Sequence, residues 1–275
     1  MTIEPAAPAI IDGIPAFAPA LARTSAGFDP EAFEEIADLE ADSFWFRARN
    51  ALITWAARTY APSANAIHEI GCGTGFVLQA LQRAYPEADL SGSEILVDGL
   101  RIARDRLPDV RFFQMDARAM PHRRMFDLVG AFDVLEHIEE DEAVLSEIHG
   151  ALRPCGVLLL TVPQHRWLWS DQDDAARHVR RYETDDLHTK LTTAGFDVLR
   201  STSFVTLLLP AMLVTRRLGG RRAEAGVEAV RVPWLLDRAM RPVMAVERWL
   251  IQAGLSMPAG GSRLVVARRS DTSGG

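Results

Sequence analysis

Short apolar runs alternate with helical segments through the middle of the chain. The runs with strand character are AIHEI (66–70), DLSGSE (89–94), VRFFQ (110–114), FDLVGAF (126–132), GVLLLTV (156–162) and FDVLRSTSF (196–204). Helical periodicity fills the stretches between them, at 75–85, 96–106, 139–152 and 183–194. Short strands separated by helices are typical of parallel sheets covered on both faces. With SRLVVARR (262–269) as the last strand, we predict an α/β fold with a doubly wound, mostly parallel, seven-stranded sheet.

The regions that flank this alternation have a different character. Residues 1–27 are rich in Ala and Pro without helical or strand period, which predicts a flexible leader. Residues 28–62 have helical periodicity and are predicted to form a cap on the core at 63–204. Residues 205–258 are apolar and helix-like, so we expect a helical insertion before the last strand at 259–270.

Composition and charge exclude several classes of protein. The 275 residues are 48% hydrophobic and 24% charged, as in globular chains that fold without disulfides or metal. The net charge of −7 argues against nucleic-acid binding. Cys72 and Cys155 have no partners at zinc spacing, so we predict no metal site and a reducing, cytoplasmic compartment. The chain shows no signal-peptide pattern at its start and no apolar run of the ~18 residues that a membrane span needs.

The most informative motif is HEIGCGTGF, at 68–76, where a predicted strand runs into a predicted helix. Glycines at 71, 73 and 75 let the backbone turn sharply and let a ligand approach where a Cβ would clash. The helix that follows offers unpaired N–H groups to a polar or anionic ligand group. A plain strand-to-helix turn is the alternative interpretation.

Carboxylates follow the next predicted strands along the chain. Glu94 ends the second strand about twenty residues after Gly71, a position that suits ribose hydroxyls. Asp116 ends the third strand, where it can accept a bond from an exocyclic amine or cap a helix. Asp133 ends the fourth. Because ligands of open α/β sheets bind at the carboxyl ends of strands, these positions predict one binding site.

Taken together, these motifs resemble the class I S-adenosylmethionine-dependent methyltransferases, in particular the group that contains the ubiquinone- and menaquinone-biosynthesis methyltransferases. EIGCGTG is similar to the first motif of that family, Glu94 to its ribose-binding acid, MDA (115–117) to its adenine-contacting segment and FDVLEH (132–137) to its fourth motif. The resemblance implies that S-adenosylmethionine is the cofactor. It implies cofactor contacts for Arg47, Glu69, Gly71, Cys72, Gly73, Gly75, Glu94, Ile95, Met115, Asp116, Ala117, Phe132, Asp133 and His137.

Two arginines are candidates for the residue that donates hydrogen bonds to the carboxylate of the cofactor. Arg47 or Arg49, in FWFRARN, could fold over that carboxylate, and a solvated helix face is the alternative for both.

Three other functions are weighed against methyl transfer. A nicotinamide dehydrogenase would carry G-x-G-x-x-G, whereas the third glycine comes one residue early here. A nucleic-acid methyltransferase would carry an N-P-P-Y-type tetrad after the fourth strand, where FDVL stands. A catalytically silent cofactor-binding protein is disfavoured because every predicted cofactor residue is present.

Methyl transfer requires alignment of the acceptor and, for an acidic proton, a base. The candidate bases are His137, His178 and Tyr182. The long segment 163–182 is predicted to bind the acceptor through Trp167, Trp169, His178, Arg181 and Tyr182. An ion-paired surface lid is the alternative, and the acids at 171, 173 and 174 are a weak metal pattern. We therefore expect methylation of a small-molecule or lipid- or glycan-linked acceptor, on oxygen.

The insertion at 205–258 leaves three roles open. Its apolar faces are broken by Arg238, Arg241 and Arg248, a pattern compatible with a helix on a membrane surface. Such a helix would bring a cytoplasmic enzyme to the inner face of the membrane. A substrate roof and a homodimer interface are the alternatives.

Overall fold

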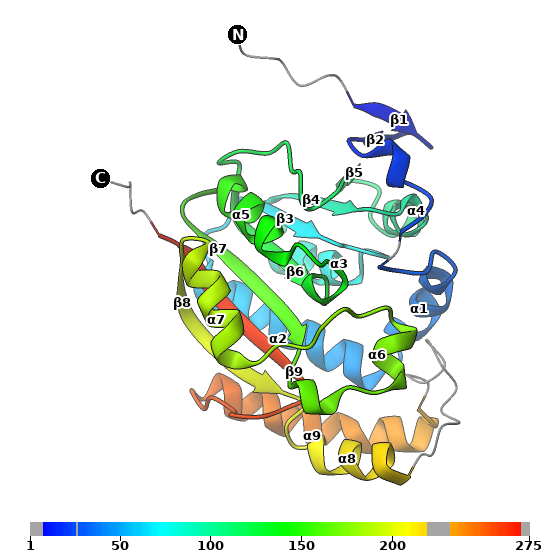
Figure 1. Cartoon of the computed structure of the whole chain (residues 1–275), viewed down its shortest axis with the longest axis vertical. Helices are drawn as coiled ribbons and strands as arrows, with labels where there is room; N and C mark the ends of the chain where they lie inside the picture. The colour runs from blue at the N-terminus through cyan, green and yellow to red at the C-terminus, as the bar shows by residue number, and fades with distance from the viewer. Residues whose placement is uncertain (1–7, 26, 219–231, 271–275) are drawn as a thin grey trace.

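The computed structural model describes residues 8–25, 27–218 and 232–270. A nine-stranded sheet crosses the molecule, with helices on both faces (Figure 1). Its strands are β1 (Ala9–Ile11), β2 (Ile14–Ala16), β3 (Ala66–Ile70), β4 (Asp89–Glu94), β5 (Arg111–Gln114), β6 (Phe126–Phe132), β7 (Leu152–Pro163), β8 (Phe196–Phe204) and β9 (Ser262–Arg269). The α-helices are α1 (Ala32–Glu40), α2 (Phe44–Tyr60), α3 (Phe76–Ala84), α4 (Val97–Arg106), α5 (Asp141–Ala151), α6 (Asp171–Ala175), α7 (Thr184–Thr193), α8 (Leu209–Leu218) and α9 (Trp234–Gln252).

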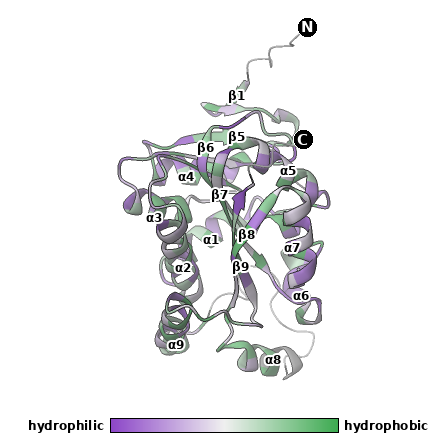
Figure 2. Ribbon diagram, turned by 90° about the vertical axis from the view of Figure 1, so that its left-hand side faces the viewer, coloured by the Kyte–Doolittle hydropathy of each residue, from purple (hydrophilic) through white to green (hydrophobic). Residues whose placement is uncertain are grey.

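The order of the strands confirms the doubly wound fold. The sheet runs β1-β2-β5-β4-β3-β6-β7-β9-β8, and the pairs from β5 to β7 are all parallel. β9 is antiparallel to both of its neighbours. Figure 2 shows α2, α3 and α9 on one side of the sheet and α5, α6 and α7 on the other. Each side has its own buried apolar cluster, because helices cover both faces of the sheet.

The N-terminal region differs from the predicted flexible leader and raises the number of strands from seven to nine. β1 and β2 form a hairpin whose second strand joins the sheet edge, where Ala16 pairs with Gln114. Asp12 and Gly13 form the turn, with φ angles of 52° and 78°. An Asp-Gly pair between apolar residues is a strong hairpin signal, and the high Ala and Pro content of the segment concealed it. Ile14 is 2% exposed, so the hairpin buries its own apolar side chain.

The insertion contains two described helices, α8 and α9, and residues 219–231 between them lie outside the described ranges. Within those ranges, no helix has both the length and the apolar content that crossing a membrane requires.

A fully buried histidine lies at the centre of the sheet. The His68 ring nitrogens contact the hydroxyls of Ser91 and Ser93 at 2.8 and 3.0 Å, and the ring stacks on Phe126. Burial lowers the pKa of His68 to about 3. The native state therefore holds this imidazole neutral near pH 7.

This burial predicts acid sensitivity. Because the unfolded chain protonates His68 near pH 6.5 and the native state does not, the stability that His68 contributes is complete above pH 6.5 and falls as the pH decreases towards 3. The loss from His68 alone between pH 6.5 and 5 is about 2 kcal/mol. Urea unfolding at both pH values should show a smaller decrease for His68→Gln than for the wild type. An equal decrease in the two proteins would contradict the assignment.

Candidate functional site

The turn between β3 and α3 has a backbone that only glycine adopts readily. The φ angles of Gly71, Gly73 and Gly75 are 62°, 50° and 77°. A Cβ on Gly71 would lie 2.4 Å from a methyl group of Val134, in the segment that follows β6. The Cys72 side chain is buried in the core, so this residue presents only its backbone to the turn. The turn is therefore closely packed against the carboxyl end of β6.

Glu94 connects this turn to the end of β4. Its carboxylate accepts hydrogen bonds from the backbone N–H groups of Gly73, at 3.2 Å, and Ile95, at 2.7 Å. The residue is 9% exposed, and burial raises the pKa of its carboxyl group above the ordinary value, although the backbone bonds oppose the shift. Glu94 thus has the place predicted for it, beside the glycines and at the edge of the site.

Two buried polar atoms beside the turn have no hydrogen-bond partner among the described residues. They are Oε2 of Glu69, at the end of β3, and Nε of Arg49, on α2. Burial raises the pKa of Glu69 well above its ordinary value, and Arg49 opposes that shift. An unpaired acceptor and an unpaired donor match the ammonium and carboxylate groups of the methionine part of S-adenosylmethionine. The residues present therefore fit the predicted cofactor.

Arg49 rather than Arg47 faces the site. Arg49 forms an ion pair with Asp133 and lies over the ring of Trp45 at 4.9 Å. Arg47 is exposed and reaches only the carbonyl of Ala41, at 3.5 Å. Because residues two positions apart on a helix point in nearly opposite directions, only one of the two arginines can face inward. The structure thus does not place Arg47 among the predicted cofactor contacts.

The predicted adenine segment follows β5. Met115 and Ala117 are buried, and the Met115 N–H donates to the carbonyl of Glu94. Burial tends to raise the pKa of Asp116, but hydrogen bonds from Arg118 outweigh this effect and lower it. The Asp116 carboxylate therefore already has a partner. At the end of β6, the Phe132 ring packs within the apolar core.

Two histidines meet where the chain leaves β6. The rings of His137 and His178 have centroids 4.8 Å apart and planes at 77° to each other. Nδ1 of His137 is buried and has no partner among the described residues. Burial, aided by His178, lowers the pKa of His137 to about 4. The structure thus brings together two of the three predicted bases.

Asp173, at the start of α6, orients His178. Its carboxylate accepts a bond from His178 Nδ1 at 2.9 Å and two bonds from Arg181, at 2.7 and 3.0 Å. Burial tends to raise the pKa of Asp173, but these bonds outweigh it and lower the pKa to about 2. Arg181, predicted to bind the acceptor, is 7% exposed and uses its guanidinium inside the protein.

Tyr182 is the third predicted base, and the structure contradicts that role. Its hydroxyl donates to Asp141 at 2.7 Å, and the residue is 1% exposed. Burial and the adjacent carboxylate raise its pKa far above the ordinary value. Tyr182 is therefore enclosed by the protein with its hydroxyl bonded to Asp141, and it is not placed to take a proton from an acceptor.

The acids of α6 do not form the metal pattern considered from the sequence. Asp171 and Asp174 are exposed, whereas Asp173 is turned towards Arg181. Another group in the described part of the chain has metal-ligating geometry. The ligand atoms of Glu136, His137 and His178 all lie within 4.8 Å of one another.

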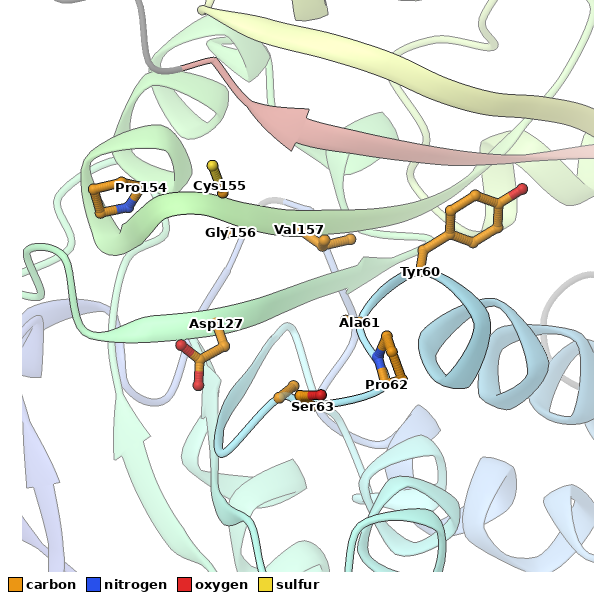
Figure 3. Close-up of a pocket in the computed structure, with 10 residues that line it drawn as sticks. Tyr60, Ala61, Pro62, Ser63, Asp127, Pro154, Cys155, Gly156 and Val157 are labelled. Carbon is orange, nitrogen blue, oxygen red and sulfur yellow. The ribbon is translucent and has the colours of Figure 1, made fainter.

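Two cavities lie near the surface. One, of about 510 Å³, is lined by Arg166, Trp169, Val179, Arg180, Arg181, Asp186 and Lys190, and so includes two predicted acceptor residues. Trp167, a third, is 57% exposed and stacks on His165. The other cavity, of about 220 Å³, lies at the amino ends of β6 and β7, between residues such as Tyr60, Asp127 and Pro154 (Figure 3). It is at the opposite end of the strands from the glycine turn and does not belong to the site.

Comparisons with solved structures confirm the fold. The cyclase SpnF superposes with a TM-score of 0.57 and 19% identity, covering 91% of this chain and 97% of its own. A Haemonchus contortus phosphoethanolamine N-methyltransferase, solved with S-adenosylhomocysteine, gives a TM-score of 0.52 and 17% identity over 79% of this chain and 52% of its own. At these identities the likeness extends to the fold alone.

Sequence comparisons identify the family as well as the fold. A trans-aconitate 2-methyltransferase of Variovorax paradoxus is 28% identical over 72% of this chain and 71% of its own length. A malonyl-(acyl-carrier protein) O-methyltransferase of Halalkalibacterium halodurans is 26% identical over 35% of this chain and 38% of its own. A family model described as a methyltransferase domain matches residues 40–201, more than half of the chain. The chain therefore belongs to the methyltransferase domain family, and its cofactor is S-adenosylmethionine.

Proposed function

We propose that this methyltransferase acts on an oxygen atom of a small-molecule acceptor, either free or linked to a lipid or glycan. The observation that carries the proposal is the His137–His178 pair, which offers an unpaired ring nitrogen beside the cofactor segment. A nitrogen acceptor with a free lone pair needs no base, whereas a hydroxyl must lose a proton. The O-methyltransferase among the relatives supports an oxygen atom as the acceptor.

The residues around the glycine turn would hold the cofactor. Backbone groups of Gly71 and Gly73 and the carboxylate of Glu94 line the ribose side, whereas Glu69 and Arg49 supply the unpaired atoms at the methionine side. S-adenosylmethionine supplies an electrophilic methyl group on a sulfonium. The turn is shielded from water by Phe33, which is 4% exposed and whose ring would lie 3.6 Å from a Cβ on Gly73.

His137 would accept the proton from the acceptor hydroxyl. Its low pKa keeps the ring neutral near pH 7, so a nitrogen lone pair is available. Asp173 accepts a hydrogen bond from Nδ1 of His178 and so fixes that ring beside His137. The two imidazoles together would orient the acceptor hydroxyl.

Replacing His137 tests this role. We expect His137→Gln to lower kcat by about 10²- to 10⁴-fold without changing the affinity for S-adenosylhomocysteine, because the base acts on the acceptor. The measurement is release of S-adenosylhomocysteine with a panel of hydroxyl-, carboxyl- and amine-bearing acceptors. His149→Gln, on the far part of α5, is the matched control and should keep full activity. Turnover of amines or carboxylates alone, or an unchanged kcat of His137→Gln with a hydroxyl acceptor, would rule out base-assisted O-methylation.

The cavity beside segment 163–182 suggests the charge of the acceptor. Its lining has four cations, Arg166, Arg180, Arg181 and Lys190, and one carboxylate, Asp186. Arg180 and Lys190 share the carboxylate of Asp141, and Arg181 pairs with Asp173, so two buried carboxylates serve three of the four cations. Cations around a tryptophan suit an acceptor that carries a carboxylate or phosphate on a flat or sugar-like body. We therefore infer that anionic acceptors are the first members of the panel to test.

A further inference from the structure

The outer face of α9 exposes large apolar side chains. Trp234, Leu235, Val246 and Trp249 are 70%, 64%, 53% and 64% exposed, and their spacing puts them on one side of the helix. We refer to these four residues as the outer face of α9. The two tryptophans stand about 22 Å apart along the axis, at 1.5 Å per residue. An isolated exposed tryptophan is ordinary, but an aligned set of this length marks a contact surface.

The opposite side of the helix anchors it to the protein. Met244 and Ile251 are buried, and α9 packs against α2. Asp237 accepts a bond from the N–H of Phe44, the first residue of α2. Glu247 caps the start of the α8 region through the backbone N–H groups of Val205, Thr206 and Leu207, at 2.5 to 2.7 Å. The orientation of α9 is therefore fixed, and its outer face is turned permanently outward.

The carboxylates of α9 lie on its buried side, whereas its arginines lie on or beside its outer face. Its only carboxylates, Asp237 and Glu247, are 7% and 1% exposed and are used in the internal bonds just described; Asp237 also forms an ion pair with Arg241 at 2.7 Å. Arg238 is exposed, and Arg241 and Arg248 flank the outer face. The outward side therefore combines tryptophans with arginines and has no acid. Such a surface is complementary to an apolar layer with anionic groups at its edge.

A second copy of the chain fits this surface less well. A two-fold interface brings the same patch of both subunits together, so Arg238 and Arg248 would approach their own copies, while the carboxylates of α9 are buried and Asp237 is already paired with Arg241. A bilayer satisfies both properties, because tryptophan rings settle at the level of the headgroups and arginines pair with lipid phosphates.

We propose that the outer face of α9 docks the enzyme onto an anionic lipid bilayer. Figures 1 and 2 place α8 and α9 at the end of the molecule that is farthest from the N-terminus. α9 is bonded to the start of α2, and the same helix carries Arg49 at the cofactor site. Docking would therefore hold the methyl-transfer site close to acceptors in the membrane. The inference does not depend on which atom is methylated.

Vesicle flotation with the full chain tests the proposal. We expect the protein to float with vesicles of phosphatidylglycerol and phosphatidylcholine at low salt, and less with phosphatidylcholine alone or at high salt. The Trp234→Ser/Trp249→Ser variant should lower the partition coefficient about tenfold or more. Trp167→Ser is the matched control, since it removes an exposed tryptophan elsewhere, and it should stay within about twofold of the wild type.

Two results would overturn the proposal. One is the absence of flotation of the wild type with anionic vesicles at low salt, or an equal loss in Trp167→Ser. The other is a dimer in light scattering that the double tryptophan variant dissociates, because this would assign the surface to a second copy. All three tryptophans are exposed, so thermal melting should confirm that each variant is folded. Methyl transfer to a water-soluble acceptor, measured without vesicles, should be the same in the wild type and in Trp234→Ser/Trp249→Ser.

Discussion

Replacing Asp173 by alanine is expected to lower the free energy of unfolding by about 3–5 kcal/mol. The variant removes a carboxylate that is 1% exposed and leaves the guanidinium of Arg181, which is 7% exposed, without its charge partner. A buried cation without a counter-charge is far more costly than a missing surface contact. His178 would also lose the bond to its Nδ1, so catalysis should fall together with stability.

Urea unfolding at pH 7 measures this effect, and Asp171→Ala is the matched control. Asp171 lies on the same short helix but is exposed, so its replacement should change stability by less than about 0.5 kcal/mol. A decrease of similar size in both variants would mean that the helix itself, and not the buried ion pair, stabilises this segment.

Adding one methyl group to the glycine turn should have the second large effect. Gly71→Ala puts a Cβ at a φ of 62° and within 2.4 Å of Val134. The backbone strain and the overpacking together should cost about 2–4 kcal/mol. Since relief of the clash must displace the segment that carries Asp133 and His137, we also expect the Kd for S-adenosylhomocysteine to increase at least about tenfold.

One control variant and one rescue variant separate the cost of backbone strain from the cost of the clash with Val134. Gly254 has a φ of 104° and nothing within 4 Å of an added Cβ, so Gly254→Ala measures the cost of backbone strain without a clash. Adding Val134→Ala to Gly71→Ala removes the clashing methyl groups and should restore cofactor binding in part. If the double variant binds S-adenosylhomocysteine no better than Gly71→Ala does, the clash with Val134 is not the reason why position 71 requires glycine.

Periodicity predicted the central sheet well because its physical cause is local. The residues at 66–70, 89–94, 126–132 and 196–204 form strands with the predicted bounds. The runs at 66–70 and 126–132 are mostly apolar because helices cover both faces of the sheet there. The hairpin at 9–16 was missed because its signal is two residues long and lies in a segment whose composition suggests disorder.

The site residues were predicted less completely because their roles depend on orientation. The glycines and Glu94 follow from the position of strand ends, which the sequence reveals. The choice between Arg47 and Arg49 requires the direction of a helix face. The roles of Asp173 and Tyr182 depend on contacts with Arg181 and Asp141, which no local pattern shows.

Calorimetric titration with S-adenosylhomocysteine tests the central claim most directly. The wild type should bind it, and Glu94→Ala should bind at least about 30-fold more weakly, since the predicted hydrogen bonds from the ribose hydroxyls to the Glu94 carboxylate are lost. NAD, titrated in parallel, should give no heat of binding. Equal affinity in both proteins, or binding of NAD in place of S-adenosylhomocysteine, would contradict the account of the glycine turn and Glu94 as the cofactor site.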